Sequence, residues 1–417
     1  MKQYDLVVIG GGFAGTAAAI SAARSGLDVL LVERSNCLGG AAANCLVNPF
    51  MPYATIDKET GQRLYLSQGI FKEILNELNS FGGLLNESRF NEEYLKLILN
   101  RMAQKAGVTL LFNTTFVEVK KESRRITSAV FVNKSGKFEV AADFFADATG
   151  DADVAFSAGC PNHVGREDGL CQPMTLCFRM VNVDVDKVMR SKDEINRIYR
   201  EFQNKGSIKN PREDVLMFTV PIEGVIHFNS TRIVKLNPVD GFDVTKAEIE
   251  AREQVFELVN FMKENIAGFE NSVLMSTAIQ IGVRESRMID GQYTLTQEDL
   301  QACTKFADGI AACSYDIDIH NPEGSGTSHW YFPEGEYYTI PYRCLLPQKA
   351  DNLIVAGRCI SSTHEAQASY RIMPVVCCIG EAAGTAVSIA KKDCVPLTAV
   401  NTDKLRKTLK QNGAFCG

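Results

Sequence analysis

Three glycines and one carboxylate near the start of the chain have the types and spacing that bind a dinucleotide. Gly10, Gly12 and Gly15 form a G-x-G-x-x-G pattern, and Glu33 follows 18 positions after Gly15. In such a pattern the first glycine permits a tight turn, the second lets the backbone approach a pyrophosphate, and the third lets a helix pack on a strand. A carboxylate at this spacing accepts both ribose hydroxyls. The set therefore predicts a dinucleotide site.

The elements that must position these residues follow in the required order. Leu6–Ile9 is a short apolar run typical of a buried parallel strand, and Val29–Val32 predicts a second one. Between them, Thr16–Arg24 predicts a helix of small residues with Gly26 as its C-cap. The free N–H groups at that helix N-terminus favour a pyrophosphate. The alternative to a dinucleotide site is a glycine turn in some other α/β fold. Such a turn would not require both flanking strands and the acid, which are all present here.

Composition excludes several functional classes. The 417 residues carry a net charge of −6, so the chain has no general basic surface for nucleic acid. The 13 cysteines show no repeated spacing, which favours reduced thiols and a cytoplasmic protein over a disulfide framework. No tight run of cysteines suggests an iron–sulfur cluster. We also expect no metal site, no signal peptide and no membrane span.

A second glycine pair follows the acid at Gly39 and Gly40, with Ala41 after it. Together with the first motif, this stretch resembles the flavoprotein superfamily of the glutathione reductase and succinate dehydrogenase type. The resemblance implies FAD bound in extended form, with the second pair along its pyrophosphate and toward its ring. Taken alone, the pair is equally typical of an ordinary glycine-rich loop.

Two later segments look like the other FAD signatures of this superfamily. An apolar run leads into Ala148-Thr149-Gly150-Asp151, and another leads into Gly357-Arg358, where the usual acid is replaced by an arginine. The resemblance implies contacts to the adenosine half and the ribitol of FAD. The FAD-binding residues that it implies are Gly10, Gly12, Phe13, Ala14, Gly15, Glu33, Arg34, Gly39, Gly40, Ala41, Val117, Thr149, Gly150, Asp151, Gly357, Arg358, Gly380 and Gly384.

Shorter motifs narrow the resemblance, which extends from Gly10 to Gly384. They are G-V-R-E-S-R at 282–287, Y-D-I-D-I-H at 315–320, A-G-R-C-I-S at 356–361 and H-E-A at 364–366. Together they look like the family of FAD-dependent oxidoreductases, which also resembles the flavin subunit of heterodisulfide reductase. Only one dinucleotide fingerprint is present, so we expect no separate nicotinamide domain.

The predicted fold class is α/β. We expect a Rossmann-type FAD-binding domain in residues 1–159 and 345–417, interrupted by a substrate or cap domain in residues 160–344 with a mixed, largely antiparallel sheet. Period-two runs predict the cap strands. Thr245–Ile266 predicts a long cap helix whose buried face carries Ile249, Phe256, Val259, Met262 and Ile266.

Local signals predict helix caps and a hairpin in the FAD-binding domain. Asn91 precedes two glutamates and a 3.6-residue apolar period, which predicts a helix N-cap. Asp153 is expected to be the N-cap of the helix that follows Gly150. Phe116–Val119 and Ile126–Asn133 predict a hairpin, near which the resemblance implies an adenine contact.

The resemblance places catalysis between two segments, 284–287 and 358–371. FAD would carry the redox chemistry, while the protein supplies position, charge and a proton. Arginines could bind a substrate carboxylate bidentately, and a histidine or tyrosine could handle a proton. The catalytic candidates are His364, Arg371, Arg284, Arg287 and Tyr370. For each arginine the alternative is a domain-interface ion pair or a phosphate contact.

Three functions fit these observations. The first is an FAD-dependent oxidoreductase that acts on a small, anionic organic substrate. The second is a flavin electron-transfer subunit with an iron–sulfur protein as its partner, and the third is a non-catalytic flavin-binding redox sensor. Dithiol reductases of the superfamily place the first of two cysteines where this chain has Ala42, so disulfide exchange through Cys45 is disfavoured.

Overall fold

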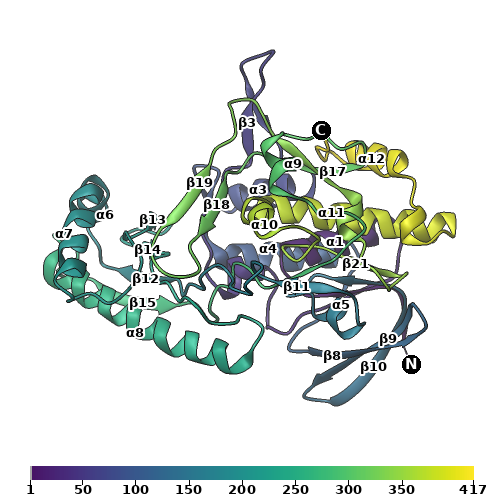
Figure 1. The fold of residues 1–417 in the computed structure, drawn as a ribbon, viewed down its shortest axis with the longest axis horizontal. Coiled ribbons are helices and arrows are strands. Elements are labelled where there is room, and N and C mark those ends of the chain that lie inside the picture. The colour runs from purple at the N-terminus through teal and green to yellow at the C-terminus, as the bar shows by residue number, and fades with distance from the viewer. Residues whose placement is uncertain (1) are drawn as a thin grey trace.

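The computed structural model describes residues 2–417 and confirms the α/β fold class. Its main sheet has five parallel strands in the order β7, β2, β1, β10 and β21 (Figure 1). All four residues of β2 are buried, as expected of a strand covered on both faces. These strands are β1 (Gln3–Ile9), β2 (Val29–Val32), β7 (Thr109–Leu111), β10 (Gly136–Asp147) and β21 (Leu353–Val355).

The predicted hairpin is present and continues the sheet. Strands β8 (Thr115–Glu122) and β9 (Arg125–Asn133) pair antiparallel, and β9 pairs antiparallel with the first half of β10. The second half of β10 lies between β1 and β21. Strand β10 therefore joins the parallel sheet to an antiparallel extension.

Four helices build the core beside this sheet: α1 (Phe13–Arg24), α3 (Ile70–Ser80), α4 (Glu92–Lys105) and α11 (Met373–Asp393). The predicted N-cap is confirmed, because the Asn91 side chain accepts hydrogen bonds from the N–H groups of Glu93 and Tyr94. Helix α11 is long and apolar enough to cross a membrane, but its apolar stretch is entirely buried inside the protein.

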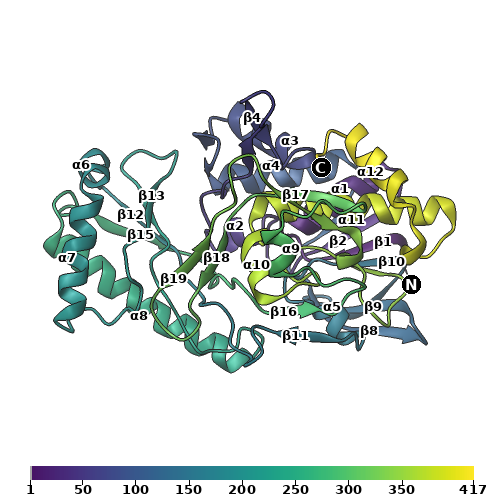
Figure 2. The same cartoon turned by 45° about the horizontal axis from the view of Figure 1, so that its top comes forward.

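A smaller lobe contains the predicted cap (Figure 2). Its four-stranded antiparallel sheet has the order β13, β14, β12 and β15, and helix α8 packs its buried residues into the same core. The elements of the lobe are β12 (Phe178–Val181), α6 (Val185–Arg190), α7 (Lys192–Asn204), β13 (Met217–Thr219), β14 (Ile226–Phe228), α8 (Gly241–Asn265) and β15 (Val273–Thr277).

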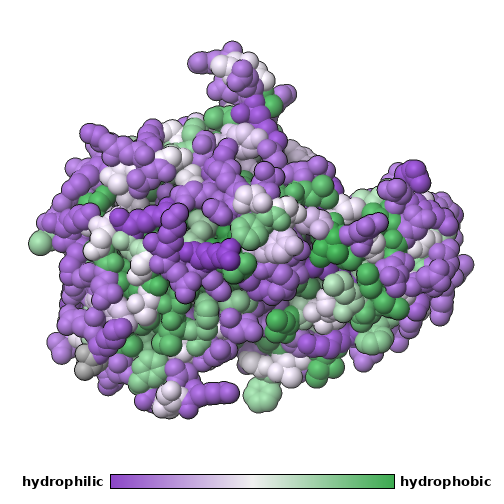
Figure 3. All heavy atoms as spheres, turned by 180° about the vertical axis from the view of Figure 1, so that it is seen from behind, coloured by the Kyte–Doolittle hydropathy of each residue, from purple (hydrophilic) through white to green (hydrophobic). Residues whose placement is uncertain are grey.

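The predicted buried face of α8 is partly wrong. Val259 and Met262 are buried, but Ile249 and Phe256 are 62% and 58% exposed. The buried face instead includes Ala247, Ala251 and Leu258. The buried face thus contains alanines together with larger apolar residues, while Ile249 and Phe256 lie on the exposed face. Apolar side chains accordingly interrupt the polar surface of this lobe in Figure 3.

The two hydrophobic cores divide the chain differently from the predicted domains. Apart from Leu46, the second core contains residues from Met174 to Ile281. The segment from Ile289 to Leu346 packs into the first core, although the expected cap extended to residue 344. The reason is local: β17 pairs with β20 and contacts α11 of the first domain.

The remaining elements are short segments around these two cores. They are α2 (Ala41–Asn44), β3 (Ala54–Ile56), β4 (Arg63–Tyr65), β5 (Leu84–Leu85), β6 (Arg89–Phe90), α5 (Asp153–Ser157), β11 (Asn162–Val164), β16 (Arg287–Ile289), α9 (Gln297–Gln301), β17 (Gly309–Cys313), β18 (Ile317–His320), β19 (Thr327–Trp330), β20 (Tyr338–Pro341), η1 (Tyr342–Leu345), α10 (His364–Tyr370), η2 (Leu397–Ala399) and α12 (Thr402–Gln411).

Candidate functional site

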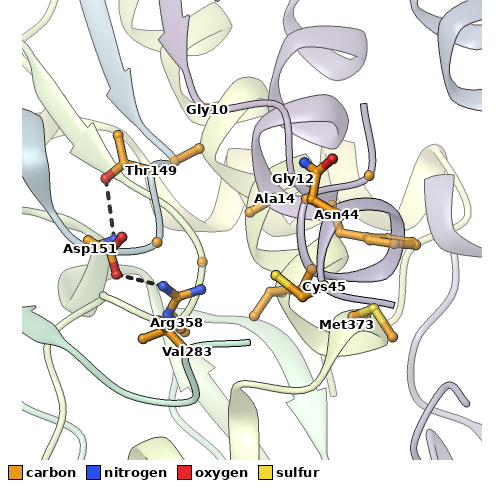
Figure 4. A pocket seen from close by; sticks show the side chains of 18 of the residues that line it. Gly10, Gly12, Ala14, Asn44, Cys45, Thr149, Asp151, Val283, Arg358 and Met373 are labelled. Carbon is orange, nitrogen blue, oxygen red and sulfur yellow. Dashed lines mark hydrogen bonds and ion pairs between the residues drawn. The ribbon is translucent and has the colours of Figure 1, made fainter. Parts of the chain in front are cut away.

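A cleft of about 950 Å³, partly open to solvent, lies at the carboxyl ends of β1, β10 and β21. This is where open α/β sheets bind ligands. Figure 4 shows Thr149, Asp151 and Arg358 on one side of it, with Cys45 and Met373 on the other. Most residues predicted to bind FAD line this cleft: Gly10, Gly12, Phe13, Ala14, Glu33, Arg34, Gly39, Gly40, Ala41, Thr149, Gly150, Asp151, Gly357 and Arg358.

The glycine turn forms a cradle that side chains would fill. Gly10 has a φ of +103°, and a Cβ there would lie 2.3 Å from the Ala148 carbonyl oxygen. Gly12 differs, because the nearest atom to an added Cβ is the Gly40 Cα at 3.9 Å. The space in front of Gly12 therefore belongs to the cleft, beside the free N–H groups at the start of α1. This geometry fits the pyrophosphate of FAD.

Glu33 lies where a ribose-binding acid is required. Its buried carboxylate accepts hydrogen bonds from the N–H groups of Gly11 (2.6 Å) and Ser35 (2.7 Å), which fix its orientation. Glu33 also lines a smaller adjoining pocket with Phe116. Val117, the predicted adenine contact, does not line either pocket and is 45% exposed.

Three of the predicted glycines serve packing and do not line the cleft. A Cβ on Gly15 would lie 1.8 Å from the Gly10 carbonyl oxygen, which agrees with the expected helix–strand contact. Cβ atoms on Gly380 and Gly384 would lie 2.0 and 2.1 Å from carbonyl oxygens of α1. The structure therefore corrects the assignment of Gly380 and Gly384 to FAD. Their spacing of four residues is that of a helix-packing face.

Arg358 forms an ion pair on the cleft wall. Its guanidinium donates to the Asp151 carboxylate at 2.6 Å, while its Nε has no partner within the described chain. Burial opposes ionisation of Asp151, but Arg358 and a hydrogen bond from Ser286 outweigh it and hold the pKa of that carboxyl below its usual value. Arg358 is thus a fixed cation in the cleft.

The predicted cap at Asp153 is wrong. The N–H groups of Val154 and Ala155 donate to the carboxylate of Asp147, each at 2.9 Å, so Asp147 caps α5. Asp153 instead pairs with Arg287 at 2.9 Å. Arg287 also lies over the Phe156 ring, and it does not line the cleft. Arg287 therefore forms a structural ion pair, which was the alternative to its binding a substrate.

Tyr370 is also excluded from the cleft. The residue is fully buried, and its hydroxyl shares a hydrogen bond of 2.7 Å with Ser362 Oγ. Burial raises the pKa of Tyr370 well above its ordinary value. A phenol held in this way does not exchange protons with a ligand in the cleft.

Arg371 is the catalytic candidate that does line the cleft, at its Met373 end. It donates to the Gln172 side chain at 3.4 Å, its nearest carboxylate is Asp318 at 4.0 Å, and its Nε has no partner in the described chain. The neighbouring Arg284 donates to the carbonyl oxygen of Pro173 and does not line the cleft. Burial and the charge of Arg371 lower the pKa of Arg284 to about 9.

His364 does not line the FAD cleft but a separate cavity. Its Nδ1 lies 2.7 Å from the Glu285 carboxylate, and its Nε2 has no partner in residues 2–417. The prediction of a proton donor beside the flavin is therefore not met by its position. His320 lies between Arg232 and Asp318, and its pKa is lowered to about 3 mainly by burial.

Several cleft residues were not among the predicted site residues. They come from α2 and its C-cap, from the cap segment after β15 and from the start of α11: Asn44, Cys45, Gln280, Ile281, Val283, Met373 and Val376. Burial raises the pKa of the Cys45 thiol to about 11, so it is protonated at neutral pH. Among residues 2–417, no group of three or more His, Cys, Asp or Glu side chains has the arrangement of a metal site.

Comparison with known proteins agrees with this site. A model of the family described as FAD dependent oxidoreductase matches residues 5–409. Digeranylgeranylglycerophospholipid reductase from Thermoplasma volcanium is 26% identical over 201 residues, covering 45% of this chain and 49% of that protein. Thioredoxin reductase from Ureaplasma parvum is 33% identical over 126 residues, covering 30% and 37%. The matches thus span about half or less of these relatives.

Two solved structures are among those to which the chain is similar. A geranylgeranyl bacteriochlorophyll reductase-like protein from Thermoplasma acidophilum has a TM-score of 0.48 and 14% identity, covering 99% of this chain and 84% of that one. The flavin-dependent brominase Bmp2 has a TM-score of 0.49 and 11% identity, covering 98% and 83%. The family match over almost the whole chain is what identifies the protein: it belongs to the FAD-dependent oxidoreductases and is an enzyme that uses FAD.

Proposed function

We propose that the enzyme oxidises or reduces a small anionic organic substrate at the Met373 end of the cleft. The observation that carries this proposal is Arg371, a cation that lines the cleft, has an unpartnered Nε and lies 4.0 Å from its nearest carboxylate. A guanidinium with free donors is suited to bind a carboxylate or phosphate bidentately.

The surrounding residues favour binding and orientation of such a substrate. Ile281 and Val283 of the cap, with Met373 and Val376 of α11, give this end of the cleft apolar walls. Charge interactions with Arg371 and Arg358 are stronger in that environment than in bulk water. Bound FAD supplies the hydride-transfer chemistry, while the chain positions the reacting groups.

The names of two relatives support an anionic substrate. They are a geranylgeranyl diphosphate reductase from Rhodobacter capsulatus, which covers 29% of this chain, and the glycerophospholipid reductase described above. Both names contain a phosphorylated compound. Since the matches cover only part of each protein, they favour the charge of the substrate and not its carbon skeleton.

The test is an anaerobic screen of metabolites for bleaching of the flavin absorbance band. We expect anionic compounds to bleach it, and we expect Arg371→Lys to raise the apparent dissociation constant of the active compound about tenfold, which is about 1.4 kcal/mol. The matched control is Arg190→Lys, because Arg190 lies exposed on α6.

Three outcomes would contradict the proposal. Neutral compounds could bleach the flavin as well as anions do. The protein could purify with an iron–sulfur chain and show no turnover alone, which would favour the electron-transfer subunit. The flavin could cycle between redox states while no metabolite changes its spectrum, which would favour the redox sensor.

A further inference from the structure

Helix α8 lies along the lower edge of the cap lobe in Figure 1 and carries an exposed apolar stripe. Phe242, Ile249 and Phe256 form this stripe and are 83%, 62% and 58% exposed. Residues seven apart differ by only about 20° around a helix, so the three side chains lie on one face. That face is opposite the buried face of α8. The stripe is therefore open to solvent in the part of the chain that the structure describes.

The area of the stripe matches what a dimer contact needs. With about 200 Å² for a fully exposed large side chain, the three residues expose roughly 400 Å² of apolar surface. A stable interface buries about 800 Å² on each partner, and somewhat more than half of that area is apolar. The stripe thus supplies most of the apolar area of such a contact, and its polar flanks supply the rest.

Charged side chains flank the stripe in a pattern that suits a second copy of the same helix. Lys246 and Glu253 lie on the same side of Ile249, at roughly 60° and 40° around the helix, because each residue turns it by about 100°. We propose that α8 is the contact between two copies of this chain, which pack antiparallel about a two-fold axis at Ile249. Such an axis places the same surface patch against itself.

This register brings complementary groups together. Phe242 packs on Phe256 of the second copy, and the two Ile249 side chains meet at the axis. Lys246 lies three residues from the axis and Glu253 of the second copy lies four residues from it at the same end, so a rise of about 1.5 Å per residue leaves them nearly level. The opposite signs of their charges favour the contact, once at each end of the symmetric pair.

Both charged groups have the capacity for this contact. Glu253 forms no ion pair in the described residues, whereas Arg252 is paired with Glu248 of the same helix. Lys246 is paired with Asp243, but its side chain is 66% exposed and an ammonium group has three donors. One pair within the helix therefore leaves donors for a second copy.

A lipid surface fits the stripe less well than a second copy does. Helix α8 contains six acidic residues and three basic ones. Helices that lie on anionic membranes are instead rich in lysine and arginine on their polar face. The charge of α8 consequently opposes binding to anionic lipids, while the lysine and glutamate beside the stripe complement each other across the two-fold axis.

The experiment is sedimentation equilibrium of the full-length, FAD-loaded protein between about 1 and 100 µM, since interfaces of standard size have dissociation constants in the micromolar range or below. We expect the average mass to rise with concentration from near 45.9 kDa toward twice that value. Folding measurements at or below about 1 µM are accordingly made on the monomer. The mass does not depend on turnover, so this result is separate from that of the metabolite screen.

Ile249→Glu should remain a monomer over the whole range, because two carboxylates would meet at the axis. Ile249 is exposed, so the variant should keep its circular dichroism spectrum and its FAD. Leu97→Glu is the matched control, because Leu97 is also exposed on a helix, α4, but lies outside the stripe. It should form dimers as the natural protein does.

A charge exchange tests the register. Lys246→Glu and Glu253→Lys should each weaken dimerisation about tenfold, because each creates two like-charge contacts in the symmetric pair. The double variant Lys246→Glu/Glu253→Lys should recover the natural dissociation constant to within about twofold, since it restores opposite charges.

Four outcomes would overturn the proposal. The mass could stay near 45.9 kDa up to the highest concentration. Ile249→Glu could dimerise as well as the natural protein. The double charge exchange could fail to recover the affinity lost in the single variants. The monomer could instead cosediment with phosphatidylcholine vesicles and lose this binding in Ile249→Glu, which would assign the stripe to a lipid surface.

Discussion

At the scale of single residues, Gly12 is the most sensitive position of the cleft. No protein atom lies nearer than 3.9 Å to a Cβ added there, so the side chain of Gly12→Val would occupy the space of the pyrophosphate without disturbing the fold. We expect the variant to lose FAD and to keep its circular dichroism spectrum. Gly241→Val is the control, because its Cβ also meets open space but lies on α8 of the cap. Retention of FAD by Gly12→Val after gel filtration would place the pyrophosphate elsewhere.

Glu33 is expected both to bind FAD and to stabilise the fold, and one substitution tests both roles. Glu33→Ala should weaken FAD binding by about 1–3 kcal/mol, the cost of leaving polar partners unpaired. Its carboxylate also accepts hydrogen bonds from Gly11 and Ser35, so the melting temperature of the FAD-free protein should fall as well. FAD affinity measured by fluorescence quenching tests the first effect. Unchanged affinity with a lower melting temperature would leave Glu33 a purely structural residue.

Sequence reasoning at this scale succeeded where a backbone requirement restricts the residue type. Gly10 and Gly40 were found because their positions tolerate little else. Ile281 lines the same cleft but was missed, because an apolar residue fits many sites and no spacing distinguishes this one. His364 was misplaced because its closeness in sequence to Gly357 was taken for closeness to the flavin.

At the scale of elements, α8 shows the limit of periodicity. Of the residues predicted for its buried face, Val259 and Met262 are buried while Ile249 and Phe256 are exposed, and the helix buries Ala247, Ala251 and Leu258 in their place. Which face of a helix is buried depends on tertiary packing, which the apolar pattern does not contain.

This packing predicts a large loss of stability for one substitution on α8 and a small loss for another close by. Leu258→Ala should lower the free energy of unfolding by about 2–5 kcal/mol, because Leu258 is fully buried. Phe256→Ala removes a larger side chain but should cost less than about 0.5 kcal/mol, since Phe256 is 58% exposed. Urea titrations of the two variants provide the comparison. A larger loss of unfolding free energy in Phe256→Ala than in Leu258→Ala would show that the face predicted from sequence is the buried one.

At the scale of the whole molecule, the chain leaves the FAD-binding domain, builds the cap and returns. The return was predictable, because the apolar run before Gly357 must pair with the sheet, and β21 does so beside β10. The boundary was not, because β17 lies within the segment expected to form the cap and yet pairs with β20 and contacts α11. A buried ion pair of 2.6 Å between Glu92 of α4 and Arg179 of β12 joins the two domains.

The stability of the whole molecule should depend on pH through Glu381, a buried residue of α11. The Ile70 N–H at the start of α3 donates to its carboxyl group at 2.9 Å, but burial dominates and raises its pKa from 4.5 to about 7. Between these two values the folded protein holds a proton that the unfolded chain has lost. The free energy of unfolding should therefore fall as the pH rises from about 4.5 to 7 and stay lower above that range.

Glu381→Gln removes this titration and still offers an oxygen to the Ile70 N–H. Urea midpoints at pH 5 and pH 8 should differ less in the variant than in the natural protein, and at pH 8 the variant should be at least as stable. The FAD-free protein is the sample for both, so that cofactor binding does not contribute. An equal pH dependence in the two proteins would mean that Glu381 is ionised in the fold and that α3 and α11 are joined by a buried charge.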